Sequence, residues 1–214
     1  MKNRAFVVLG AGGHARVVLE ALDSTGLKAD ALTDPDSSLW GASVEGVRVV
    51  GGDDKLADYP PASHAAAIGV GAARDTRRRR ALHEAAVAAG YDLPPVVAAS
   101  ACVARSARLG PGSQVLTRAV VHPGAAIGAG AVVNTAAVVE HDCVVGDHVF
   151  VGPAAILCGG ARLGAGAFVG AGAIVLPGLA IGAGALLAAG AVVRADVPDG
   201  GKELGRGFRG EAKR

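Results

Sequence analysis

The chain has 214 residues, enough for one large domain or two small ones with a buried core. Glycine (33 residues) and alanine (46 residues) make up more than a third of it, and hydrophobic residues reach 51%. This composition excludes a disordered chain, which is poor in apolar residues, and collagen, which needs a three-residue glycine period. The net charge of +2 and the aromatic content of 3% argue against nucleic acid and an anionic membrane as partners.

The start of the chain and its cysteines bear on location. The segment MKNR runs directly into the apolar FVVLG without a signal-peptide pattern, and no apolar stretch is long enough for a membrane helix. Three cysteines at irregular positions predict a reduced chain without a disulfide framework. We therefore expect a cytoplasmic protein.

Strands and helices alternate in the first half, which predicts a small Rossmann-like α/β domain with a parallel sheet over residues 1–95. Three apolar runs predict strands, at residues 6–10, 29–33 and 66–70. Two periodic segments predict helices, at residues 15–22 and 74–89. The inward positions expected for the second helix are Leu82, Ala85, Ala86 and Ala89.

A glycine-rich loop follows the first strand. Gly10, Gly12 and Ala15 match the G-x-G-x-x-[G/A] pattern, and Asp34 follows about twenty residues later. This pattern indicates phosphate binding at a helix N-terminus, but a unit of this length is too short for a complete dinucleotide fold. A nucleoside diphosphate fits better than NAD. The alternative is that the glycines only allow a tight turn between strand and helix.

The second predicted helix carries four consecutive arginines, Arg77 to Arg80. Four consecutive residues spread around a helix, so we interpret them as a solvated, salt-bridged surface rather than a phosphate-binding patch. His83 and His148 are interpreted as surface residues.

A six-residue repeat dominates the second half. Every sixth residue from 97 to 193 is Val, Leu or Ile, without an insertion, and the residue four places later is small in nearly every hexad. This period fits neither a helix nor an alternating strand, and it predicts a parallel β-helix with flat faces. The leading residues are Val97, Val103, Leu109, Val115, Val121, Ile127, Val133, Val139, Val145, Val151, Leu157, Leu163, Val169, Val175, Ile181, Leu187 and Val193.

This repeat resembles that of the hexapeptide-repeat acyltransferases, which implies a left-handed β-helix with three hexads per coil. We therefore expect a β-helix domain over residues 96–198 and a tail over 199–214, rich in Gly and charge, that is a candidate for disorder. With three hexads per coil, residues eighteen apart stack about 4.8 Å from one another. A purely structural β-helix without activity is the alternative.

One hexad carries three ionisable residues in a row, Glu140, His141 and Asp142. Unpaired charges are costly inside so thin a β-helix, so these side chains are expected to point outward. Coil stacking then places Glu140 beside His122. An imidazole flanked by carboxylates suits general-base catalysis, and the alternative is an ordinary surface triplet. The histidine spacing and the missing C-x-x-C disfavour a metal site, and no G-x-S-x-G elbow is present.

The segments GAGGHARVV, LTD, IG and NTAAVVEHDCVVGD together resemble bacterial sugar acyltransferases of the sialic-acid O-acetyltransferase type. Within them, the chain is most similar to N-acetyltransferases that act on nucleotide-linked 4-amino sugars. This resemblance implies acetyl-CoA as donor, a nucleotide sugar as acceptor, no metal, and a homotrimer with active sites between adjacent β-helices.

The same resemblance implies roles for individual residues. His141 would be the catalytic base, supported by Asn134, Glu140 and Asp142. The implied nucleotide-sugar residues are Gly12, Gly13, His14, Asp34 and Gly69. The implied coenzyme A residues are Gly159, Ala171 and Ala189, with Phe150 at the position where many relatives carry a second histidine.

The chain departs from the family pattern at Phe150 and at its C-terminus, where relatives usually end in G-x-P-A-[KR]. Three hypotheses stay open from the sequence. The first is acetyl transfer to the amine of a nucleotide sugar, and the second is O-acetylation of a sugar hydroxyl. The third is an inactive β-helix that binds a nucleotide sugar.

Overall fold

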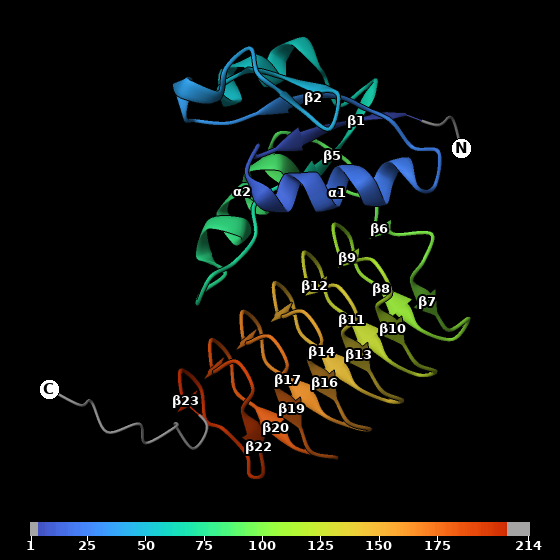
Figure 1. The fold of residues 1–214 in the computed structure, drawn as a ribbon, viewed down its shortest axis with the longest axis vertical. Coiled ribbons are helices and arrows are strands. Elements are labelled where there is room, and N and C mark those ends of the chain that lie inside the picture. The colour runs from blue at the N-terminus through green and yellow to red at the C-terminus, as the bar shows by residue number, and fades with distance from the viewer. Residues whose placement is uncertain (1–3, 205–214) are drawn as a thin grey trace, which may run out of the picture.

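The computed structural model describes residues 4–204, which form an N-terminal α/β unit followed by a long β-helix (Figure 1). The α/β unit lies along one side of the β-helix, over its first coils, and helix α1 (Gly13–Asp23) faces the β-helix. The two parts are packed through a shared apolar cluster in which α1 contacts Leu116, Val132 and Phe150.

The sheet of the α/β unit has five strands in the order β3-β4-β2-β1-β5. Its bounds are β1 (Ala5–Leu9), β2 (Ala29–Thr33), β3 (Ser43–Val44), β4 (Val47–Gly51) and β5 (His64–Ile68). All neighbours are parallel except β3 and β4, which form an antiparallel hairpin around Glu45 and Gly46, both at positive φ. The three predicted strands, β1, β2 and β5, pair in parallel as expected, and the β3–β4 hairpin, which was not predicted, makes the sheet mixed.

Helices cover both faces of this sheet. The side chains of Phe6 and Val8 point to the face covered by α1, and those of Val7 and Leu9 point to the face covered by α2 (Arg77–Ala88). Two short 3-10 helices, η1 (Ser37–Leu39) and η2 (Asp53–Asp58), follow strands β2 and β4.

The buried side of α2 differs from the prediction. Arg79, His83 and Ala86 are its buried residues, whereas Ala85 and Ala89 are exposed. The reason is that α2 packs against the β-helix as well as against the sheet: the rings of His83 and His148 lie 5.0 Å apart, edge to face. The surface interpretation was therefore wrong for His83 and for Arg79.

The β-helix confirms the repeat. Each hexad gives one two-residue strand, with the predicted Val, Leu or Ile as the second, inward residue. Three parallel sheets form its faces. The domain face, against the α/β unit, comprises β6 (Val96–Val97), β9 (Gln114–Val115), β12 (Val132–Val133), β15 (Phe150–Val151), β18 (Phe168–Val169), β21 (Leu186–Leu187) and β23 (Lys202–Glu203).

The other two faces of the β-helix differ in the residues whose side chains point outward. The apolar face comprises β7 (Cys102–Val103), β10 (Val120–Val121), β13 (Val138–Val139), β16 (Ile156–Leu157), β19 (Ile174–Val175) and β22 (Val192–Val193). The arginine face comprises β8 (Arg108–Leu109), β11 (Ala126–Ile127), β14 (Val144–Val145), β17 (Arg162–Leu163) and β20 (Ala180–Ile181). The fold is a left-handed β-helix, as expected.

The pairing of the strands gives the number of residues in each coil. Val120 pairs with Val138 and Val138 pairs with Ile156, so each coil takes eighteen residues. Strand β23 pairs with β21, so the β-helix continues past the predicted boundary at residue 198. Of the predicted tail, residues 205–214 lie outside the described part of the chain.

Candidate active site

The three ionisable residues of the unusual hexad lie at the corner between the apolar face and the arginine face. The side chains of His141 and Asp142 are exposed, as predicted. His141 Nδ1 lies 3.0 Å from Asp142 Oδ2. Glu140 Oε1 instead lies 3.7 Å from Nε2 of His122, one coil earlier, as the stacking predicted. Asp142 is therefore the carboxylate that can orient the His141 ring.

The backbone at Asp142 explains how this pair forms. Asp142 has a φ of 60°, in the left-handed region that glycine occupies at the equivalent corners, such as Gly160 and Gly178. Asp is one of the few other residues that adopt this conformation readily. A Cβ at Gly124, one coil earlier, would collide with the Asp142 carboxylate, so the neighbouring coil leaves room for the pair.

Gly159 lies directly beside the His141 ring. A Cβ at Gly159 would be 2.5 Å from His141 Nε2, so only glycine leaves the ring in this position. The structure thus brings together a predicted catalytic residue and a predicted coenzyme A residue.

Ala171 and Ala189 lie elsewhere, at the exposed corner between the domain face and the apolar face. Asn134 lies at this same corner, where its Oδ1 accepts a hydrogen bond of 2.7 Å from the Thr135 N–H. The width of the apolar face separates this corner from the one that carries His141. Within one chain, therefore, Asn134 does not join the His141 cluster.

Phe150 is buried on the domain face. Its ring stacks on Phe168 with a centroid distance of 5.5 Å, and it lies 6.4 Å from the ring of His14. Phe150 therefore packs the two parts of the chain together and is not next to Gly159.

The glycine-rich loop leaves open space above helix α1. Gly12 is the N-cap of α1 and provides no side-chain cap, and a Cβ at Gly12 or at Gly13 would have no atom of the chain within 4 Å. The first N–H groups of the helix are thus accessible from this space. Such an arrangement suits a phosphate group.

Asp34 and Gly69, which were also predicted to bind the nucleotide, hold this loop in place. Asp34 accepts hydrogen bonds from the backbone N–H groups of Ala11 (2.8 Å) and Asp36 (3.0 Å), one on each carboxylate oxygen. Gly69 packs so closely that a Cβ would collide with Gly10 and would lie 2.8 Å from Val8. In this structure both residues position the loop.

His14 lies at the junction between the α/β unit and the β-helix. Its Nε2 is 2.8 Å from Oε1 of Gln114, whose amide N–H donates to the carbonyl of Ile68. Burial, and then the nearby Arg79, lower the pKa of His14 to about 4. The imidazole is therefore neutral at pH 7 and donates from Nε2 to Gln114.

Arg79 and Gln114 complete the junction around His14, and neither was predicted from the sequence. Arg79 donates hydrogen bonds to the carbonyls of Val70 and Gly130, and burial lowers its pKa to about 9. One signal in the sequence could have singled out Gln114. It is a glutamine at an outward strand position of the repeat, where aliphatic residues prevail. Nothing in a run of four arginines distinguishes the one that is buried.

Acid should weaken the junction because its histidines are held neutral. Burial lowers the pKa of His14, His83 and His148, so the unfolded chain binds more protons than the folded chain below about pH 6.5. For His14 alone we expect a loss of about 3 kcal/mol of unfolding free energy between pH 7 and pH 4. Urea unfolding of the wild type and of His14→Gln across this range measures the loss. An equal loss in both proteins would contradict this role.

A pocket of about 220 Å³ opens at the carboxyl ends of the parallel strands. It lies between the ends of β1, β2, β4 and β5 and the start of α2, and the charged residues that line it are Asp53 and Arg78. The carboxyl edge of an open α/β sheet is the usual ligand site of such folds. The glycine motif predicted the loop at this edge, whereas no motif marked Asp53 or Arg78 as residues of a pocket.

Residues 4–204 contain neither a metal-binding cluster nor a membrane-spanning helix. No group of three or more His, Cys, Asp or Glu side chains there could hold a metal ion. No helix in that range has the length and apolar character needed to cross a membrane.

The chain is similar to a known protein family and to several solved structures. Residues 5–85 match the PglD N-terminal domain. The acetyltransferase domain of PglB from Neisseria gonorrhoeae FA1090, solved in complex with acetyl coenzyme A, is 37% identical with a TM-score of 0.86. The match covers 94% of this chain and 95% of that domain. Comparison with curated proteins gave no match.

Two further structures extend the similarity. PerB from Caulobacter crescentus, in complex with CoA and GDP-perosamine, is 39% identical over 91% of each chain, with a TM-score of 0.84. WeeI from Acinetobacter baumannii AYE is 26% identical over 92% of this chain and 95% of its own, with a TM-score of 0.79. The chain therefore belongs to the hexapeptide-repeat family of acetyl-CoA-dependent nucleotide-sugar N-acetyltransferases.

Proposed function

We propose that this enzyme transfers the acetyl group of acetyl-CoA to the amine of a nucleotide-linked amino sugar, with His141 as general base. The observation that carries the proposal is the His141–Asp142 pair, exposed at a corner where Gly159 leaves one side of the ring clear. It is supported by the relatives solved with acetyl coenzyme A and with CoA and GDP-perosamine.

Proton transfer runs through the His141 ring. The Asp142 carboxylate accepts a hydrogen bond from Nδ1–H, which leaves Nε2 unprotonated and able to accept a proton. As the sugar amine attacks the thioester carbonyl, Nε2 takes the proton that the amine nitrogen loses. The C–N bond forms, the C–S bond breaks, and the imidazolium returns the proton to the departing thiolate.

A backbone donor is available for the oxygen of the tetrahedral intermediate. In residues 4–204 the N–H of Gly159 donates no hydrogen bond, whereas those of its neighbours Cys158 and Gly160 donate to Val175 and His141. Gly159 also adjoins the His141 ring. We assign its N–H to the developing oxyanion.

The active site needs a second copy of the chain. The α/β unit covers the domain face (Figure 1). In a three-sided prism, the corner between the other two faces, which carries His141, lies opposite that face. One chain therefore cannot bring its own nucleotide loop to its own His141. The outward column of the apolar face, Val120, Val138, Ile156, Ile174 and Val192, supplies a surface for a partner copy.

We accordingly propose a homotrimer, in which three prisms close around one axis without free ends. Burying the apolar face brings the His141 corner of one copy toward the opposite corner of the next, which carries Asn134, Ala171 and Ala189. Acetyl-CoA would lie in the groove between them. Three free cysteines suit a reducing compartment, so we place the reaction in the cytoplasm, where the acetylated sugar serves glycan biosynthesis.

Gly12→Val should weaken the binding of the nucleotide sugar more than tenfold and leave acetyl-CoA affinity unchanged. A Cβ at Gly12 meets no atom of the chain within 4 Å, so we expect the fold to be kept, but the side chain fills the space in which phosphate oxygens approach the helix N–H groups. Isothermal titration with each ligand measures both affinities. Unchanged nucleotide-sugar binding would return these glycines to a turn-forming role.

The function is tested by release of free CoA thiol from acetyl-CoA. The acceptors are 4-amino sugars linked to GDP, UDP and dTDP, together with matched sugars that carry a hydroxyl at the same carbon. We expect release only with an amine acceptor. Release with hydroxyl acceptors alone would indicate an O-acetyltransferase, and release with none would indicate an inactive binding protein.

A further inference from the structure

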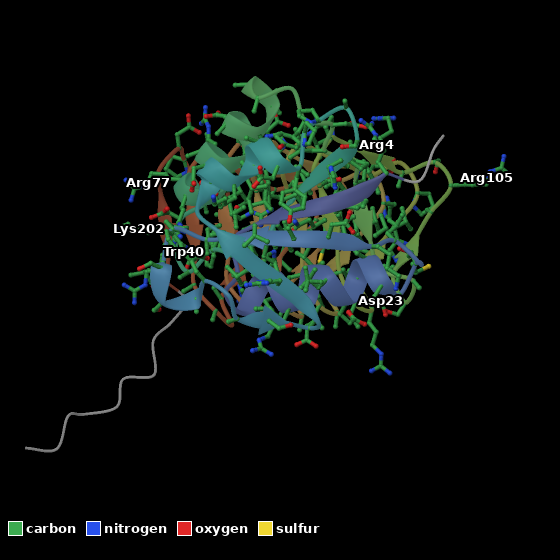
Figure 2. The ribbon with its side chains drawn as sticks, turned by 90° about the horizontal axis from the view of Figure 1, so that it is seen from above. Arg4, Asp23, Trp40, Arg77, Arg105 and Lys202 are labelled. Atoms are coloured by element: carbon green, nitrogen blue, oxygen red, sulfur yellow. The ribbon has the colours of Figure 1, made fainter. Side chains whose placement is uncertain are left out.

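The pocket at the carboxyl edge of the α/β sheet is large enough for part of a ligand only. Its volume of about 220 Å³ is smaller than the roughly 300–1,000 Å³ of pockets that enclose a whole small ligand. Pro35, Val70 and Leu82 give it apolar walls. Figure 2 shows Trp40 and Arg77, which lie close in sequence to the pocket residues Pro35 and Arg78, on the same side of the molecule, opposite Arg4.

Asp53 presents a positioned carboxylate to this pocket. Its Oδ1 accepts a hydrogen bond of 2.8 Å from the hydroxyl of Thr33, which is fully buried at the end of β2. A carboxylate has about four acceptor positions. Thr33 occupies one of them, and no other residue in the described range 4–204 donates to Asp53. The carboxylate is thus fixed in place with most of its acceptor capacity unused.

Arg78 presents donors to the same pocket. Its neighbours in the arginine run are engaged: Arg77 pairs with Asp75, Arg80 pairs with Glu84, and Arg79 is buried against backbone carbonyls. Between residues 4 and 204, Arg78 forms no ion pair within 4.0 Å, and in particular none with Asp53. The two opposite charges therefore line one pocket with space between them.

We propose that this pocket binds the nucleobase of the acceptor and that Asp53 makes it select guanine, an inference that rests on the proposed function. Guanine is the common base whose pairing edge offers two adjacent donors, N1–H and N2–H, which match the two oxygens of a carboxylate. Its O6 and N7 are acceptors for a guanidinium such as that of Arg78. Uracil and thymine offer one N–H between two carbonyl oxygens, which the carboxylate repels.

The test measures the binding of nucleoside diphosphates to the full-length protein, without acetyl-CoA or an amino sugar. We expect GDP to bind the wild type at least tenfold more tightly than UDP, dTDP or ADP. Asp53→Asn should lower GDP affinity about 10- to 100-fold and leave UDP affinity within threefold, because the amide keeps the Thr33 contact but loses the charge and one acceptor. Asp54→Asn, the neighbouring carboxylate that does not line the pocket, is the matched control.

Binding of UDP to Asp53→Asn shows that the variant is folded. Equal affinity of the wild type for GDP and UDP, a GDP preference that survives Asp53→Asn, or the absence of nucleotide binding would each overturn the inference. Failure of the proposed function gives a different result, because a protein that releases no CoA thiol can still prefer GDP. Conversely, loss of base selection leaves acetyl transfer to an amine intact.

Discussion

His141→Ala is expected to lower kcat by about 10²- to 10⁴-fold, the usual contribution of a general base, with the KM for acetyl-CoA nearly unchanged. The variant removes the proton acceptor but leaves the Gly159 backbone and the rest of the corner in place. Steady-state release of CoA thiol at saturating acceptor measures both constants. Retention of more than half the wild-type activity would exclude base catalysis by His141.

Three further variants distinguish the role of His141 from the roles of the residues around it. His148→Ala removes an imidazole at a different corner, where it contacts His83, and should change kcat little. His122→Ala removes the partner of Glu140 and should also cost far less than His141→Ala. Asp142→Asn should give an intermediate loss of kcat, because Asn tolerates the left-handed backbone and still accepts from Nδ1–H but does not stabilise the imidazolium.

Ile174→Glu is expected to convert the trimer into smaller species and to remove nearly all activity. The side chain of Ile174 points outward on the apolar face between Ile156 and Val192, so the glutamate would be buried without a partner at the proposed interface. Sedimentation velocity at micromolar concentration measures the assembly, and CoA-thiol release measures activity in the same samples.

Ala180→Glu provides the matched control for this experiment. Ala180 is the outward residue of the next strand, on the arginine face, where it pairs with Arg162. A glutamate there has a cationic neighbour and lies off the proposed interface, so the trimer and its activity should persist. A wild-type protein that sediments as a monomer, or an Ile174→Glu variant that stays fully active, would contradict an active site shared between copies.

The β-helix could be predicted closely because its signal is local and repeated. Each hexad specifies its own strand and corner, and one stacking rule then places distant residues together, as the contact of His122 with Glu140 shows. The rule could not decide which carboxylate holds the His141 ring, since that depends on the backbone conformation of Asp142.

The junction between the two parts could not be predicted, because no repeat relates α2 to the β-helix. Arg79 and His83 read as surface residues by helical periodicity alone, and they are buried because a β-helix corner packs on that side of the helix. Phe150 likewise takes its role from the α/β unit above it. Such contacts between distant segments override local pattern.

The stacked coils also make the β-helix a nearly one-dimensional lattice, in which, over residues 96–203, the strands of each coil pair only with those of the coils before and after it. Loss of structure should then begin at β23, which within the described part of the chain pairs only with β21, and proceed by fraying of one coil after another. The coil that carries His141 lies inside the stack, so such opening reaches it only after the coils that follow it in sequence. By the same reasoning, insertion or deletion of one whole coil would shift the length of the prism while leaving the register of the His141 corner unchanged.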